Sequence, residues 1–148
     1  EVVVTDGHNY ARNLMIEDLD PRARLNYGAP SYLSMVQGVD QGVDAIMFIA
    51  YHARAGTPDA VLCHSWSRQT TNIWINGRVL GEFGLNSSVA GSFGVAPLMI
   101  TGDLAVCNEA KELVPDLETA GSQPLLYKKT PRAFSPRISP TRRYTAND

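Results

Sequence analysis

The sequence predicts an α/β fold in which a mainly parallel sheet carries helices on its faces, in a three-layer, Rossmann-like arrangement, together with one antiparallel hairpin. Two observations lead to this prediction. Strand-like apolar runs alternate with segments of helical periodicity along the first 120 residues. Between them, β-branched and aromatic residues flank Asn76-Gly77, the dipeptide most favoured in two-residue hairpins. The 148 residues, 44% hydrophobic and 19% charged, suit one globular domain.

The expected elements follow one another in strand-helix order, which implies mainly parallel pairing. Strands are expected over 1–5, 23–25, 45–50 and 97–101, and the hairpin over 71–80. A loop with one helical turn is expected over 9–20, and a short helix over 32–38. Residues 84–94 predict an amphipathic helix with Leu85, Val89 and Phe93 on one face. A second helix is expected from its Asp103 cap to Leu113.

Charge divides the chain into two parts. Residues 1–127 carry seven Lys and Arg against fourteen Asp and Glu, whereas residues 128–148 carry six basic residues against Asp148. We expect residues 1–120 to form the domain, incomplete because the chain opens inside a strand. Residues 121–148, rich in Pro and Arg, are expected to form an extended or weakly ordered tail. The alternative, an arm for RNA or an acidic partner, rests only on Phe134 and Tyr144 among the basic residues.

Composition limits the class of protein further. No apolar run approaches the ~18 residues that cross a bilayer, so a membrane span is not expected. The two cysteines, Cys63 and Cys107, make neither a disulfide framework nor a CxxC zinc site. A reducing, cytoplasmic compartment is therefore expected, with a Cys63–Cys107 disulfide as the alternative.

Three candidate metal ligands, His8, His52 and Glu82, each follow a strand-like run. The carboxyl edge of an open α/β sheet is where such folds bind ligands. Two imidazoles and a carboxylate are the ligand set of many catalytic zinc sites. The remaining histidine, His64, falls near the same proposed site. Most histidines in proteins are not ligands, and a glutamate after a hairpin is ordinarily solvated. By themselves these residues therefore indicate a one-metal site of low specificity.

Longer motifs give more information. Along the chain these motifs are Val3-Val4-Thr5-Asp6-Gly7-His8, Leu19-Asp20-Pro21-Arg22-Ala23-Arg24-Leu25, Tyr51-His52-Ala53-Arg54-Ala55-Gly56-Thr57, Gly81-Glu82-Phe83-Gly84-Leu85-Asn86 and Thr101-Gly102-Asp103. Over residues 1 to about 118 the sequence resembles the zinc D-aminopeptidase family, the DppA-type metallopeptidases of bacteria and archaea. The segments around His52 and Glu82 are the most specific.

The resemblance implies a site and an activity. The family binds two zinc ions with an Asp-x-Glu pair, two histidines and a glutamate. By motif match, His8 and His52 correspond to the histidine ligands, Glu82 to the later glutamate, and His64 to a catalytic histidine that is not a ligand. The implied reaction is the hydrolysis of N-terminal D-amino acids from short peptides or amides, with Zn²⁺ as cofactor. The implied assembly is a homo-oligomer, a decameric ring. From the composition, a membrane is not expected as a partner, and the interpretation of the basic tail as a solvated segment argues against nucleic acid.

Two departures from the family qualify these expectations. The Asp-x-Glu pair belongs to the family's first strand, which we expect upstream of Glu1, so this chain supplies ligands for a partial site. Beyond about Glu118 the family pattern ends. The primary hypothesis is a metal-dependent D-aminopeptidase that needs residues upstream of this chain. The alternative is a non-catalytic binding or assembly subunit with the same fold and a partial metal site.

Overall fold

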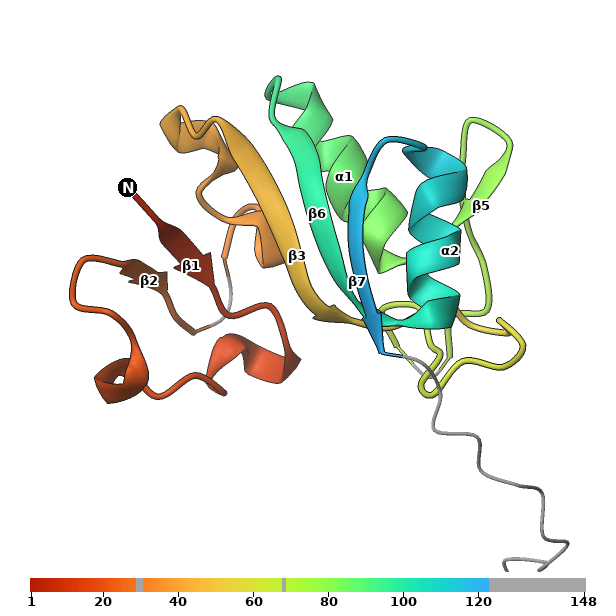
Figure 1. Cartoon of the computed structure of the whole chain (residues 1–148), viewed down its shortest axis with the longest axis horizontal. Helices are drawn as coiled ribbons and strands as arrows, with labels where there is room; N and C mark the ends of the chain where they lie inside the picture. Colours follow the sequence, from red (N-terminus) through yellow and green to blue (C-terminus); the bar gives the residue numbers. More distant parts are fainter. Residues whose placement is uncertain (29–30, 68, 123–148) are drawn as a thin grey trace, which may run out of the picture.

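The structure is a computed structural model, in which residues 1–28, 31–67 and 69–122 are described (Figure 1). Nearly all of the predicted tail over 121–148 therefore lies outside the described residues. Gly121 and Ser122, which the prediction assigned to that tail, instead end the last described strand. That strand was not predicted, because Glu118-Thr119-Ala120-Gly121-Ser122 has neither a strong apolar pattern nor aromatic residues.

The described strands form three sheets. Strands β1 (Val3–Thr5) and β2 (Arg24–Asn26) pair in parallel. Strands β3 (Ala45–Tyr51), β6 (Ala96–Asp103) and β7 (Glu118–Ser122) form a parallel sheet in that order. Strands β4 (Ile73–Ile75) and β5 (Arg78–Leu80) form the antiparallel hairpin. The predicted fold class, a mainly parallel α/β fold with an added hairpin, is confirmed.

Two α-helices accompany these strands in the described part of the chain, α1 (Glu82–Ser92) and α2 (Leu104–Leu113). Four single-turn 3-10 helices complete the set: η1 (Asn9–Ala11), η2 (Ile16–Asp18), η3 (Ser34–Val36) and η4 (Val39–Gln41). The helix expected over 32–38 is only the turn η3, since Gly38 takes a left-handed φ of 107° and ends it. No described helix is long and apolar enough to cross a membrane.

Two local predictions are confirmed in detail. Asn76 and Gly77 both have positive φ, 50° and 77°, as a type I′ turn requires. Asp103 caps α2, because its Oδ1 accepts a hydrogen bond of 2.9 Å from the Val106 amide. The first feature turns the chain from β4 into β5, which leads to α1, and the second fixes the start of α2 at the carboxyl end of β6.

The core lies between the three-stranded sheet and the two helices. Helix α1 contacts β3 and β6, and α2 contacts β6 and β7. Right-handed crossovers that advance in one direction across a sheet place both helices on the same face. Phe48 and Ile100, which are paired in register on β3 and β6, are buried there. Phe48 packs edge-to-face on Phe83 of α1 with ring centroids 5.0 Å apart.

The buried face of α1 differs from the predicted one. Phe83, Asn86 and Ala90 are buried, whereas Phe93 is 47% exposed. Small residues decide this orientation: a Cβ on Gly84 would lie 3.0 Å from side-chain atoms of both Leu80 and Leu113. Apolar residues occur all around this helix, so the spacing of Leu85, Val89 and Phe93 could not identify the packed face.

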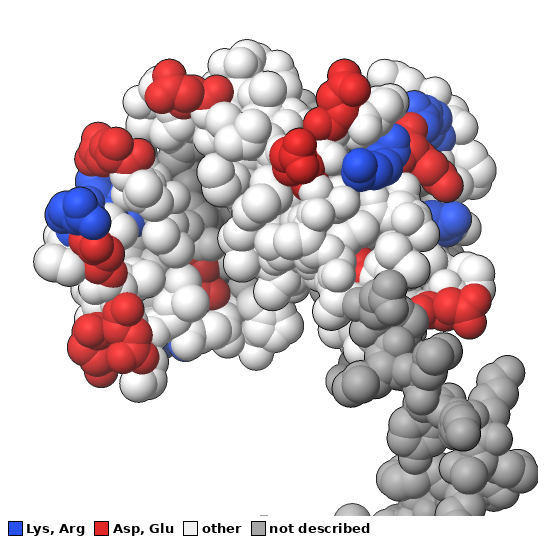
Figure 2. Space-filling model, in the orientation of Figure 1, with Lys and Arg blue, Asp and Glu red and all other residues white. Residues whose placement is uncertain are grey.

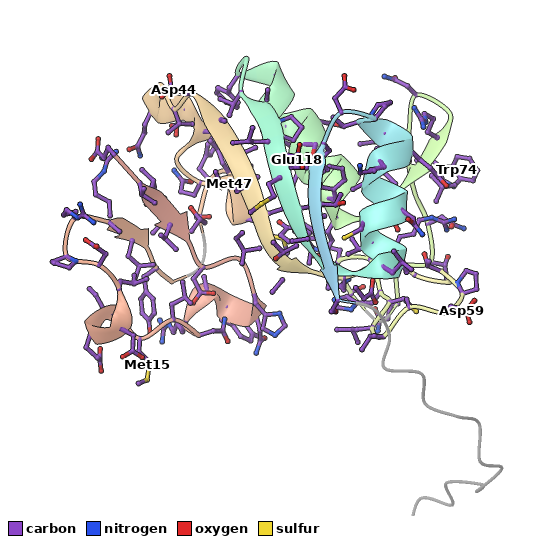
Figure 3. The ribbon with its side chains drawn as sticks, in the orientation of Figure 1. Met15, Asp44, Met47, Asp59, Trp74 and Glu118 are labelled. Carbon is purple, nitrogen blue, oxygen red and sulfur yellow. The ribbon has the colours of Figure 1, made fainter. Side chains whose placement is uncertain are left out.

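The other face of the three-stranded sheet is open in the described part of the chain. Met47 and Ile49 of β3 are 54% and 60% exposed. Figure 3 labels Met47 on β3. The described residues therefore form two of the three expected layers.

On the face drawn in Figure 2, acidic side chains are spread widely and basic ones are fewer.

Candidate metal centre

Three side chains meet beyond the carboxyl end of β3. His52 directly follows that strand, Glu82 is the first residue of α1, and His64 lies in the loop between β3 and β4. Figure 3 locates this end of the molecule: Asp44 precedes β3 at one end, and Asp59 lies in the loop at the opposite end. The carboxyl edge of the sheet therefore carries the candidate site, as predicted for an open α/β fold.

Glu82 Oε1 lies between the two imidazoles. His52 Nε2 and His64 Nε2 are each 3.5 Å from this oxygen. The two rings stack with centroids 3.9 Å apart and an interplanar angle of 26°. Glu82 is 5% exposed, whereas the side chains of His52 and His64 are 16% and 30% exposed. The site therefore has a buried carboxylate at its base and a more accessible histidine toward solvent.

The backbone orients the His52 ring. Its Nδ1 lies 3.0 Å from the carbonyl oxygen of Ala53. A carbonyl can only accept a hydrogen bond, so in this contact the proton is on Nδ1. In the metal-free protein the protonated ring also directs its Nε2–H toward Glu82, and loss of that proton leaves a lone pair on Nε2 that a metal ion can bind. A backbone carbonyl that fixes the tautomer in this way is a common feature of histidine metal ligands.

The Glu82 carboxylate is kept in its charged form. Burial alone would raise the pKa of Glu82, but hydrogen bonds from His52 and the Trp66 amide and the nearby imidazoles lower it. The Trp66 N–H donates to Oε1 at 2.8 Å. In turn the hydrogen bond to Glu82 raises the pKa of His52, against the opposing effect of burial. Each group thus favours the charged form of the other.

The loop that carries His64 is attached at several points. The Ser65 hydroxyl oxygen, which is buried, accepts a hydrogen bond of 3.1 Å from the Ala55 amide. The Val61 amide donates to Asp103 Oδ2 at 2.6 Å, so the residue that caps α2 also holds this loop. The next residue in the loop after Ser65, Trp66, has a positive φ of 62°, and its amide donates to Glu82. His64 is therefore positioned by a defined loop.

The donor set suits a zinc ion. The three candidate ligand atoms, one each from His52, His64 and Glu82, all lie within 4.8 Å of one another. A tetrahedral ion with bonds of about 2.0–2.2 Å holds its ligand atoms roughly 3.3–3.6 Å apart. The two histidine–glutamate separations of 3.5 Å match this spacing. Imidazole nitrogen and carboxylate oxygen are ligands that zinc accepts.

His8 lies outside this three-residue group. It follows β1, is exposed, and comes just before the turn η1. The buried Asp6 shapes its loop by accepting hydrogen bonds of 2.9 Å from Asn13 Nδ2 and the Leu14 amide. Figure 1 shows the segment after β1 at the same end of the molecule as the carboxyl end of β3. The structure thus brings together His52, His64 and Glu82 and leaves His8 apart from them.

Sequence reasoning missed the groups that support these side chains. The Trp66 amide on Glu82 and the Glu109 carboxylate on the Arg54 amide, at 2.8 and 2.9 Å, have no motif of their own. A glutamate on an amphipathic helix is ordinarily solvated. The single available signal was the position of Glu109, one turn after Val106 and next to Ala110, both of which are buried residues of α2.

Comparison with known proteins decides the family. The sequence model of the D-aminopeptidase family matches residues 1–136, which is most of the chain. The chain belongs to the D-aminopeptidase family. The match runs past residue 118, farther than the motifs alone indicated. A D-aminopeptidase of Bacillus subtilis (strain 168) is 40% identical over 136 residues, which is 92% of this chain and 49% of the relative.

A solved structure of the family has the same fold. It is described as the Zn-dependent D-aminopeptidase DppA from Bacillus subtilis, a self-compartmentalizing protease. The match has a TM-score of 0.81 at 43% identity and covers 84% of this chain and 46% of that one. The chain thus spans about half the length of the relatives it matches. Dependence of the relative on zinc agrees with the donor chemistry of His52, His64 and Glu82.

Proposed function

We propose that this chain carries part of the active site of a zinc-dependent D-aminopeptidase, which hydrolyses N-terminal D-amino acids from short peptides or amides. The observation that carries the proposal is the convergence of two imidazole nitrogens on the buried Glu82 carboxylate, 3.5 Å from each. It occurs at the carboxyl edge of a parallel sheet, where α/β folds place their chemistry. Relatives named as D-aminopeptidases at 40–43% identity support the reaction class.

Each side chain has a separate role in this proposal. When bound, zinc supplies Lewis acidity and makes water a better nucleophile at neutral pH. His52 holds the ion through Nε2, and Glu82 provides the negative charge and an oxygen ligand. His64, the more exposed imidazole at 30%, transfers a proton at Nε2 between the attacking water and the leaving amine. Its position beside the proposed ligands supports this role.

The rest of the site is proposed to come from elsewhere in the protein. His8 is a further ligand in this proposal, and an Asp-x-Glu pair upstream of Glu1 completes a two-metal centre. The Bacillus subtilis relative is described as self-compartmentalizing, which supports a homo-oligomeric ring for this protein as well. Cys63 and Cys107 are both free thiols, in agreement with the proposed cytoplasmic location.

Metal content and turnover of the purified chain test the proposal. With zinc or cobalt added, we expect bound metal and release of D-alanine from D-Ala-D-Ala, the turnover increasing when the preceding segment of the protein is included. His52→Ala should abolish both. A chain that binds no zinc and releases no D-alanine, alone or with that segment, would contradict the proposal.

The alternative function is a non-catalytic binding or assembly subunit. It is favoured because the three-donor group of the described residues holds two of the five ligands implied by the family, His52 and Glu82. Zinc bound without any hydrolysis, in a protein that contains the preceding segment, would support this alternative. Two metal ions per chain together with D-alanine release would exclude it.

A further inference from the structure

Helix α2 places the side chain of Glu109 between the two segments that carry the metal-binding residues. Its Oε2 accepts a hydrogen bond of 2.9 Å from the Arg54 amide. Its Oε1 is buried and has no partner of full hydrogen-bond geometry, but it lies against Gly81. Burial raises the pKa of Glu109, and the backbone N–H of Gly81 acts in the opposite direction and lowers it. One carboxylate therefore contacts the backbone of both segments.

These contacts are close to the candidate ligands along the chain. Arg54 is two residues after His52, and Gly81 comes immediately before Glu82. The segments also touch each other, since a Cβ added at Gly81 would lie 2.9 Å from Arg54 Cβ and would overlap Glu109 Oε1. The separation of these segments sets the 3.5 Å distance between His52 Nε2 and Glu82 Oε1. A group that fixes their backbones therefore controls the distance between two ligand atoms.

We propose that Glu109 is a positioning residue, which holds the Arg54 and Gly81 backbones so that His52 and Glu82 are spaced for a metal ion. Glu109 does not contact the ion in this proposal, and the inference rests on the proposed zinc site. Its negative charge also acts on His52 through space. Groups that orient ligands in this way typically contribute 10- to 100-fold to metal affinity.

Glu109 is distinguished from the other acidic residue of the same helix. Glu112 lies nearly one turn further along α2, is exposed, and contributes a backbone carbonyl rather than its side chain to a contact with Arg78. Glu112→Gln is therefore a matched control, which removes one charge from α2 without touching either ligand segment. Glu109→Gln keeps the size of the side chain and one acceptor but loses the charge. Glu109→Ala removes the carboxylate and therefore its contacts with the Arg54 and Gly81 backbones.

The first test uses the metal-free full chain and amide hydrogen exchange measured by NMR. In Glu109→Ala we expect faster exchange at Arg54 and Gly81 than in the wild type or Glu112→Gln. If Glu109→Ala does not fold, Glu109→Gln answers the same question. In that variant we expect faster exchange at Gly81, because the side-chain NH2 group of the introduced glutamine would face the Gly81 backbone N–H and could not accept a hydrogen bond from it. Unchanged exchange at both residues would overturn the proposal. Because no metal is present, this result does not depend on the proposed function.

The second test is a cobalt titration followed by visible absorption. Glu109→Ala should bind Co²⁺ about 10- to 100-fold more weakly than the wild type, with altered ligand-field bands, and Glu109→Gln should fall between them. Wild-type affinity and spectrum in Glu109→Ala would overturn the positioning role. If the wild-type chain itself binds no cobalt or zinc, the proposed function fails, and the exchange measurement alone decides the role of Glu109.

Discussion

At the scale of single residues, Glu82 is the centre of the site because three groups converge on one of its oxygens. The Trp66 amide is 2.8 Å from Oε1, and the two imidazole Nε2 atoms are each 3.5 Å away. Glu82 is nearly buried, so its charge interacts strongly with these neighbours. A buried carboxylate with one backbone donor and two imidazoles is stable as an anion and ready to bind a cation.

The pairing of His52 with Glu82 leads to a prediction about pH. The carboxylate favours the imidazolium, so the pKa of His52 is raised. In the metal-free protein this attraction stabilises the fold at low pH, and the contribution disappears as pH rises through the raised pKa. Zinc needs the neutral ring, so its affinity should fall as pH drops through the same value. An NMR titration should give a higher His52 pKa in the wild type than in Glu82→Gln; an equal or lower value would contradict the assignment.

His64 gives a second prediction at this scale. If it transfers protons and is not a ligand, His64→Ala should retain zinc while the hydrolysis of D-Ala-D-Ala falls by about 100-fold or more. Zinc content by mass spectrometry and D-alanine release, measured on the same sample, separate the two roles. Loss of zinc from His64→Ala would instead make His64 a ligand, as its 3.5 Å distance from Glu82 permits. Cys63→Ser, at the neighbouring exposed residue, is the control.

Sequence reasoning found the donors of this site but not its geometry. His52, His64 and Glu82 were each named in advance, because motifs and strand ends mark them. Their spacing could not be predicted, since it is accompanied by a contact of the Trp66 amide with Glu82 and by a contact between residues 54 and 109. Such long-range backbone contacts leave no periodic signal in a sequence. His8, which lies outside the three-residue group, stays a predicted ligand.

At the scale of secondary structure, α2 links the fold to the site through its first residues. Asp103 uses Oδ1 to cap the helix and Oδ2 to hold the Val61 amide. The same carboxylate therefore fixes the start of α2 and the loop that carries His64. This double use explains why a polar residue is buried at the carboxyl end of β6.

Mutation of Asp103 tests this link. Asp103→Ala should lower the free energy of unfolding by about 2 kcal/mol, because a helix cap and a second hydrogen bond are lost. Asp103→Asn should cost less, since asparagine is also a good cap. Urea unfolding measures both, with Asp116→Ala at an exposed position as the control. A loss in Asp103→Ala no larger than in that control would show that the cap contributes nothing.

Strand β3 allows a comparison of the two faces of the sheet. Phe48 is 2% exposed against the helices, whereas its neighbour Met47 is 54% exposed on the other face. Phe48→Ala should destabilise the chain by about 3–5 kcal/mol and Met47→Ala by less than about 1 kcal/mol, as measured by urea unfolding. Similar losses in the two variants would mean that Met47 is also covered in solution.

The elements themselves were largely predictable, because local chemistry determines them. The Asn76-Gly77 turn, the Asp103 cap and the apolar run of β3 are encoded by neighbouring residues. The buried face of α1 was not predictable, since it depends on which small residues meet Leu80 and Leu113 across the fold. Strand β7 was missed for a related reason: pairing with β6, rather than its own composition, makes it a strand.

At the scale of the whole molecule, the chain is a family member that matches about half the length of its relatives. Its described residues form a sheet with helices on one face and exposed apolar side chains on the other. Within this part of the protein, three donor side chains meet at the carboxyl edge of the sheet. The central claim is that this edge binds zinc through His52 and Glu82.

The most direct measurement of that claim is the zinc affinity of the purified chain by calorimetry, compared with that of His52→Ala, Glu82→Gln and Cys63→Ser. We predict that the wild type and Cys63→Ser bind zinc with the same affinity, and that His52→Ala and Glu82→Gln bind it at least about 10-fold more weakly. Equal zinc affinity in all four proteins, or a loss only in Cys63→Ser, would contradict the claim.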